Sequence, residues 1–256
     1  MIEINLLDKV GDKSLEKRLQ EAIDSVSTHH PEYDIKADFY VVRTTEELLY
    51  KFDDPNSETT TYPLDFNNRK KVFACTEGPD RWAAIILNNL KKTPVYMENI
   101  KASCVHEIGE LVFRDEAFET QFEKNLEPYI EKRLGKYPKI RADIIVDCMM
   151  ELKADDLAIN EGYDKQILEI RKENLKSCDN LEYFFELGYM LPAFASLQLI
   201  IRSDSNLSEE ARKVYLETKE KAIQQLNPEE ALKIFSMVEE LISIEAYKNP
   251  DAILAF

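Results

Sequence analysis

Three ionisable side chains, those of His106, Glu107 and Glu110, lie within five consecutive positions of the chain. On a helix, His106 and Glu110 are four residues apart and therefore share one face. The other residues of that face are small or mostly apolar, namely Asn99, Ala102, Ser103, Gly109 and Phe113. Buried ionisable groups are costly when unpaired, so this pair predicts a bound cation or a hydrogen-bonding partner. Glu107 points about a quarter-turn of the helix away from His106 and Glu110. It is still within reach of a water molecule that a metal on their face would hold.

A second carboxylate that points inward occurs in the segment Ile144–Ala158, which has a helical pattern. Glu151 shares its stripe with apolar and small residues (Ile144, Cys148, Ala154 and Ala158), whereas the solvent side carries Lys153, Asp156 and Asn160. An inward-facing Glu requires a cation or a hydrogen-bond donor. A metal held by the preceding helix would supply that cation.

The two segments together resemble the gluzincin metallopeptidases, in which one helix carries HExxH and a later helix carries a Glu, often within ExxAD. The matching stretches here are HEIGE at 106–110 and ELKAD at 151–155. The resemblance implies that His106 and Glu151 are metal ligands, that Glu107 is the catalytic base, and that Asp155 orients His106.

The resemblance extends from about Ala83 to Tyr163 and also implies a substrate-binding strand. The stretch Ala83–Asn88 lies upstream of the first motif, where the family has an edge strand that lines the substrate cleft. We therefore expect an extended peptide to pair with this strand by β-addition.

The chain departs from the family pattern at one ligand, because Glu110 stands where the second His is expected. A site of His106, Glu110 and Glu151 carries two carboxylates, which cancel the formal charge of a divalent ion. The metal would then be a weaker Lewis acid than in the usual site, where it lowers the pKa of bound water towards ~7. The oxygen-rich set also shifts the preference from Zn²⁺ towards Mn²⁺ or Fe²⁺.

The elements that must position these residues indicate an α+β fold. A helical pattern around Lys13–Ser27 precedes Ala37–Arg43, and Lys71–Thr76 and Arg81–Asn88 then form a hairpin around the turn Glu77–Asp80. We expect a small sheet of three or four strands, with a polar surface loop at 53–63.

Helical patterns follow from Pro94 to the C-terminus. Thr93-Pro94 and Asn227-Pro228 are predicted helix starts, and Pro192 predicts a kink or break. The predicted domains are a zincin-like one at 1–163, made of a small sheet plus the motif helices, and a helical C-terminal region at 164–256.

Composition limits the classes of function. Asp and Glu number 49 against 33 Lys and Arg, giving a formal net charge of −16, which argues against a nucleic-acid partner. The longest uncharged stretch, Leu187–Ile201, is shorter than the roughly 20 residues that cross a bilayer. No signal peptide is recognisable, and the four cysteines are widely spaced, so we predict a reduced, cytoplasmic protein without a membrane span.

Three functional hypotheses follow. The first is a gluzincin-like, metal-binding hydrolase acting on a peptide or protein. The second is a catalytically inactive zincin-fold module that regulates or binds other proteins through its acidic helical surface. In the third, His106, Glu110 and Glu151 form a hydrogen-bonded cluster without any metal.

Several neighbouring residues have simpler interpretations. Cys148 could be a soft ligand but is better explained by core packing. His29 and His30 are predicted at the C-terminal end of a helix, where the dipole favours them. The aromatic run Tyr183–Phe185, with Tyr189 and Phe194 after it, is predicted to lie in the core.

Overall fold

The computed structural model describes residues 2–8, 10–44, 47, 73–76, 82–113, 116–135, 140–203 and 206–255. The chain divides into two compact units, Met1–Val112 and Phe113–Phe256. The first contains a small sheet with helices and the second is helical, which confirms the α+β class. The domain boundary predicted after Tyr163 falls inside the second unit. The predicted loop at 53–63 and the turn at 77–80 lie outside the described residues.

The sheet of the first unit has four strands in the order β1-β2-β4-β3. Strands β1 (Ile2–Asp8), β2 (Ile35–Val42) and β4 (Trp82–Ile86) are parallel. Strand β3 (Phe73–Thr76) pairs with β4 in the antiparallel direction. This pairing confirms the predicted hairpin and the expected size of the sheet.

The prediction that Ala83–Asn88 lies at the edge of the sheet is wrong. Strand β4 pairs with β2 on one side and with β3 on the other, and all of its residues are buried. From Leu87 the chain already forms a short helix, α3 (Leu87–Leu90). Because both sides of β4 are occupied, no peptide can pair with it. Among the described strands, the outer ones are β1 and β3.

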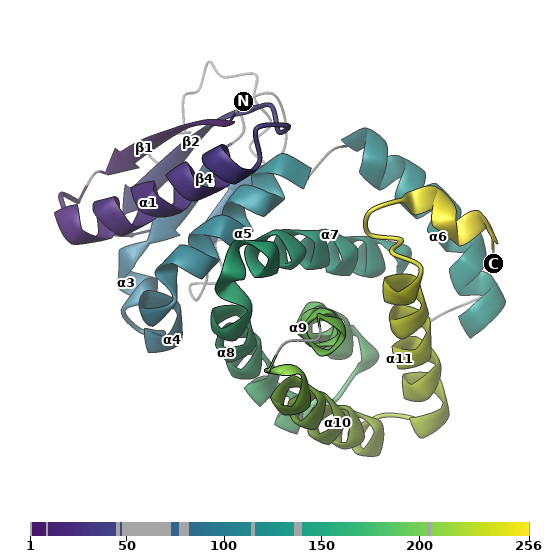
Figure 1. Ribbon diagram of the computed structural model, residues 1–256. Coiled ribbons are helices and arrows are strands. Elements are labelled where there is room, and N and C mark those ends of the chain that lie inside the picture. The colour runs from purple at the N-terminus through teal and green to yellow at the C-terminus, as the bar shows by residue number, and fades with distance from the viewer. Residues whose placement is uncertain are drawn as a thin grey trace. The chain divides into compact units, whose positions relative to one another are not determined.

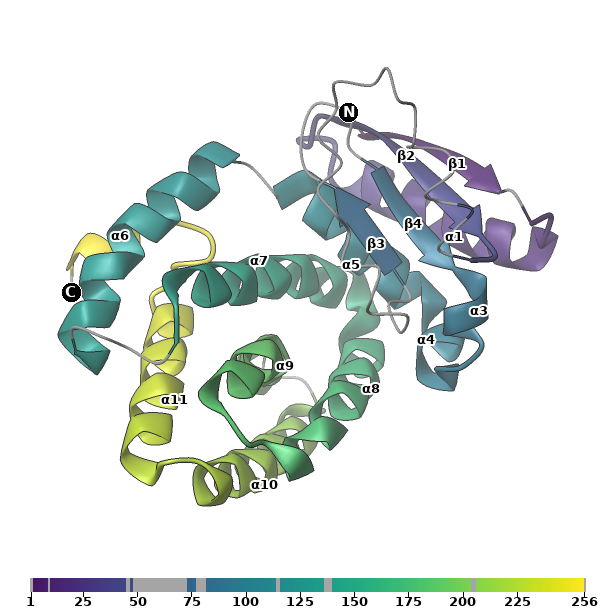
Figure 2. The ribbon, with the colours of Figure 1, turned by 180° about the vertical axis from the view of Figure 1, so that it is seen from behind.

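Two helices, α1 (Lys13–His29) and α5 (Ile100–Phe113), lie on the same face of this sheet (Figures 1 and 2). Asp12 caps α1 by accepting hydrogen bonds from the next turn, and the buried side of α1 is apolar. The Sγ atom of Cys104 on α5 lies 4.0 Å from the carbonyl oxygen of Leu19 on α1. The motif helix therefore rests directly against α1.

The C-terminal end of α1 and the start of α4 lie where the sequence predicts them. Helix α1 ends at His29, and the His30 ring stacks on Tyr33 with ring centroids 5.3 Å apart. Thr93 is the N-cap of α4 (Pro94–Glu98), with proline at its first position.

The second unit is built around one helix, α9 (Phe184–Arg202). Figure 1 looks along α9 and shows other helices of the unit around it. These are α7 (Ala142–Ala158), α8 (Asp164–Leu175), α10 (Ser208–Gln225) and α11 (Pro228–Ser243), all of which contact α9. Asn227 caps α11 as predicted.

The remaining elements of this unit connect or flank that ring. Helix α6 (Glu116–Leu134) packs against the C-terminal 3₁₀ segment η3 (Pro250–Ala255). The turn η1 (Ile159–Tyr163) joins α7 to α8, with Gly162 at φ 84°, and η2 (Lys176–Asn180) follows α8.

Helix α9 is apolar on nearly all sides because it fills the centre of the unit. The sequence predicts a kink or a break at Pro192; the break is wrong, since α9 continues through this residue to Arg202, and the kink stays a prediction. By length and composition alone α9 could cross a membrane, but 61% of its apolar window is buried inside the protein. This burial is compatible with a soluble protein, and the cytoplasmic location stays a prediction.

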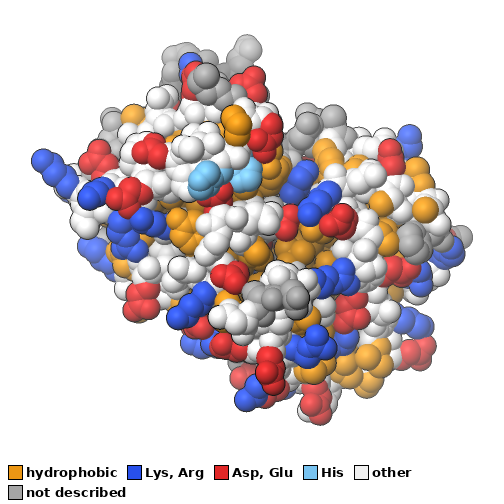
Figure 3. Space-filling model, in the orientation of Figure 1, with side chains coloured by type: hydrophobic (Ala, Val, Ile, Leu, Met, Phe, Trp, Pro, Cys, Tyr) orange, Lys and Arg blue, Asp and Glu red, His pale blue; other side chains and the backbone are white. Residues whose placement is uncertain are grey.

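The aromatic residues of α9 divide into two groups. Phe184 and Phe194 are buried, as predicted. Tyr183, Phe185 and Tyr189 are 58%, 51% and 77% exposed, so the prediction that they belong to the core is wrong. We call these three residues the aromatic surface. Elsewhere, acidic and basic side chains are interspersed, as on the face drawn in Figure 3.

Candidate metal centre

Helix α5 places the three residues of the first motif in the protein interior. His106 Nε2 lies 4.0 Å from Glu110 Oε1, and the two side chains are only 12% and 8% exposed. Glu107 is also buried. One helix thus holds an imidazole and two carboxylates largely out of bulk water, which the sequence predicts for His106 and Glu110.

The sequence of α5 explains why these polar groups are buried. Most of the helix is apolar or small, and it is buried on nearly every side, including at Val105, Ile108 and Leu111. The burial of Cys104, together with the nearby charge of Glu107, raises the pKa of the Cys104 thiol. Ionisable groups in such surroundings require partners.

Glu151 lies on α7, in the second unit, and its side chain is 26% exposed. Its Oε2 atom is 3.3 Å from Nη2 of Arg171, which is on α8. The apolar neighbours predicted for its stripe include the buried Cys148 and Ala154. Glu151 is therefore a half-buried carboxylate held beside a guanidinium group.

Asp155, one turn further along α7, is completely buried. It accepts a hydrogen bond from Arg171 Nε at 2.7 Å, and the hydroxyl of Ser196 on α9 is also within hydrogen-bonding distance. The predicted role of Asp155 in orienting His106 stays a prediction. Within its own unit, Asp155 links α7 to both α8 and α9.

His106 and Glu110 on α5 and Glu151 on α7 each offer one atom of a kind that binds metal ions. One imidazole nitrogen and two carboxylate oxygens suit a divalent ion such as Zn²⁺, Mn²⁺ or Fe²⁺. The first two residues belong to the first unit and Glu151 to the second.

Cys148 has the properties of a core residue. It is fully buried, and its burial, followed by the charge of Glu151, raises the pKa of its thiol. A thiol must be deprotonated to bind a metal well. These surroundings favour the core-packing interpretation of Cys148 over a ligand role.

Arg171 is a buried partner of Glu151 and Asp155 that sequence reasoning missed. It is 16 residues from Asp155 and 20 from Glu151 in the chain, so no local spacing connects it with them. One signal was present: Arg171 lies among the buried positions Ile167, Leu168 and Ile170 of α8. A charged residue on a buried helix face requires a buried partner of opposite charge.

Comparisons with protein-family models, with curated proteins and with solved structures found no match. The resemblance to gluzincins thus depends on the residues of the two motifs and stays a prediction.

Proposed function

We propose that this protein is a gluzincin-like metal-binding protein in which His106, Glu110 and Glu151 hold one divalent cation. The observation that carries the proposal is the proximity of His106 and Glu110, which lie on a buried side of α5. An imidazole and a carboxylate 4.0 Å apart can share a cation between them. Glu151, which the later motif provides, is proposed as the third ligand.

The contacts of Glu151 support this role. Its Oε2 atom accepts a hydrogen bond from Nη2 of Arg171 at 3.3 Å, and this contact orients the carboxylate. Arg171 is in turn held by Asp155. Residues that orient a metal ligand in this way usually matter for metal affinity almost as much as the ligands themselves.

The activity we propose to test is metal-dependent hydrolysis of a peptide bond. A bound divalent cation supplies a Lewis acid for the substrate carbonyl and favours deprotonation of water. Glu107 is proposed as the base that accepts the proton, since it lies on the helix of His106 and Glu110 and is buried like them. Two carboxylates in the ligand set would make the metal a weaker acid than a two-His site does.

The sheet offers one place for an extended substrate. Strand β3 is an outer strand among the described residues, and it runs antiparallel to β4. A peptide that pairs with β3 would extend the sheet by one strand. This proposal replaces the prediction that β4 binds the substrate.

Elemental analysis of the protein, purified without chelators, tests the metal site. We expect about one divalent ion per chain in the wild type and a loss of most of it in Glu151→Ala. Glu131→Ala, at an exposed carboxylate on α6, is the matched control and should keep the ion. A wild-type protein that carries no metal and binds none of Zn²⁺, Mn²⁺ or Fe²⁺ on titration would contradict the proposal.

The second candidate is a zincin-fold module that has lost catalysis and acts through protein–protein contacts. The exposed aromatic surface favours it, because large aromatic side chains gathered in water are typical of contact sites. The two candidates differ in Glu107, which only the hydrolase requires.

A further inference from the structure

The three residues of the aromatic surface lie side by side at the N-terminal end of α9. The ring centroids of Tyr183 and Phe185 are 5.7 Å apart, with their planes at 16°. Those of Phe185 and Tyr189 are 6.4 Å apart, with their planes perpendicular. Single exposed hydrophobic residues are common on proteins, but contiguous aromatic groups mark interaction sites.

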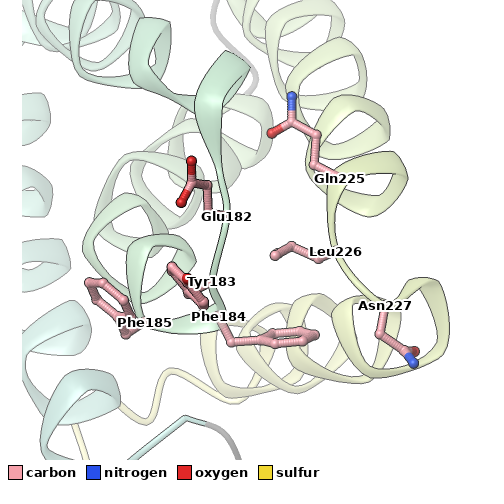
Figure 4. Close-up of a pocket in the computed structure, with 7 residues that line it drawn as sticks. All are labelled: Glu182, Tyr183, Phe184, Phe185, Gln225, Leu226 and Asn227. Carbon is pink, nitrogen blue, oxygen red and sulfur yellow. The ribbon is translucent and has the colours of Figure 1, made fainter.

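A groove of about 480 Å³ adjoins this surface. It lies between the segment Glu182–Phe185 and the segment Gln225–Asn227 at the end of α10 (Figure 4). The Gln225 amide ties the two sides together: its Oε1 accepts from the Leu181 amide at 2.9 Å, and its Nε2 donates to the carbonyl of Asp179 at 3.0 Å. These two hydrogen bonds hold the segments on either side of the groove at a fixed separation without a ligand.

The segment that carries the aromatic surface is acidic. The acidic residues of this region are Asp179, Glu182 and Glu186, and the sequence from Ser177 to Ile201 contains no Lys or Arg. Asp179 is neutralised by Lys221, whose Nζ atom lies 2.7 Å from Asp179 Oδ1. In the part of the chain that the structure describes, Glu182 and Glu186 form no ion pair. Glu182 is exposed, whereas Oε2 of Glu186 accepts hydrogen bonds from the backbone amides of Glu182 and Tyr183. Aromatic faces beside unneutralised carboxylates favour a cationic ligand.

We propose that the aromatic surface and its groove bind an extended peptide segment that carries Arg at alternate positions. A guanidinium group is planar and stacks on aromatic rings better than an ammonium group does. Alternate side chains of an extended peptide are about 6.6 Å apart. The centroid spacings of 5.7 and 6.4 Å are close to this repeat. The proposal does not depend on the metal site.

Two fluorescein-labelled peptides of equal composition and charge test this proposal: Arg-Ser-Arg-Ser-Arg-Ser and Arg-Arg-Arg-Ser-Ser-Ser. The two peptides carry the same total charge, so the net charge of −16 attracts them to a similar extent at long range, and a difference in affinity reports how the Arg side chains are arranged. We expect fluorescence anisotropy to show about five-fold tighter binding of the alternating peptide. Phe185→Ala and Tyr189→Ala should each weaken that peptide about three-fold, in line with one lost cation–π contact.

Leu254→Ala is the matched control, because Leu254 is 67% exposed and does not line the groove. It should bind the alternating peptide like the wild type, and circular dichroism should show all variants folded. Equal binding of the two peptides, or unchanged binding by both aromatic variants, would overturn the proposal. So would sedimentation showing a dimer of the wild type that Tyr189→Ala converts to monomer, since a second copy would then occupy the surface.

Discussion

Nε of Arg171 donates a 2.7 Å hydrogen bond to the carboxylate of Asp155, in the centre of the helical unit. Asp155 is completely buried and Arg171 is only 7% exposed. The same guanidinium group reaches Glu151, the proposed third metal ligand, at 3.3 Å. One arginine thus neutralises a buried charge and also orients the side chain that is proposed to bind the metal.

Arg171→Met should destabilise the protein by about 3 kcal/mol or more, because it leaves Asp155 charged and buried without its partner. The double variant Asp155→Asn/Arg171→Met removes both charges and should be markedly more stable than the single variant. Urea unfolding followed by circular dichroism measures both effects. Arg212→Met, at an exposed arginine on α10, is the control and should change the free energy of unfolding by less than about 0.5 kcal/mol. Equal losses in the single and double variants would show that the ion pair is not what Arg171 contributes.

Glu110→His tests the charge argument for the metal site. The substitution restores two His ligands and one carboxylate, so a divalent cation would keep one positive charge. We expect Zn²⁺ affinity, measured by competition with a chromophoric chelator, to rise at least about ten-fold. Glu123→His adds a histidine at an exposed position of α6 and controls for non-specific binding. If both variants bind Zn²⁺ equally, position 110 is not a ligand position.

Glu107→Gln distinguishes the two candidate functions. The substitution keeps the size of the buried side chain and removes its basicity. A hydrolase should lose about 100-fold or more in kcat against an unstructured protein substrate such as casein, while keeping its metal. Glu98→Gln, at an exposed position of α4, should retain full activity. Protein binding without any turnover in the wild type would instead favour the regulatory module.

Local patterns predicted those parts of the structure that depend on neighbours in the sequence. The β3–β4 hairpin, the helix starts at Thr93-Pro94 and Asn227-Pro228, and the burial of His106 and Glu110 on one helix all follow from spacing within a few residues. In each case the periodicity of a helix, or the chemistry of a turn or cap, fixes the outcome.

The predictions that were wrong concern long-range packing. Whether β4 is an inner or an outer strand depends on the strand order, which the local sequence does not encode. Pro192 was expected to kink or break its helix; α9 does not break there, because the four helices that contact it maintain it by packing. The aromatic run on α9 has one buried and one exposed side. Because the residues on both sides are aromatic, the sequence alone does not distinguish them.

The hydroxyl of Tyr40 on β2 gives a pH-dependent prediction. It donates to Asp38 Oδ2 at 2.8 Å, and burial, followed by this hydrogen bond, raises the pKa of Tyr40 to about 12. An unfolded tyrosine titrates near pH ~10. Because the folded state holds the proton more tightly, this contribution to stability is complete below about pH 10 and is lost as the pH rises towards about 12.

Tyr40→Phe removes the titrating group, so its free energy of unfolding should fall less between pH 9 and about pH 11 than that of the wild type. Urea unfolding at the two pH values measures the difference. Tyr189→Phe, at a tyrosine that is 77% exposed, should behave like the wild type. If Tyr40→Phe loses as much stability as the wild type over this range, the proton on Tyr40 is not coupled to folding. The alkaline sensitivity would then have to come from other groups.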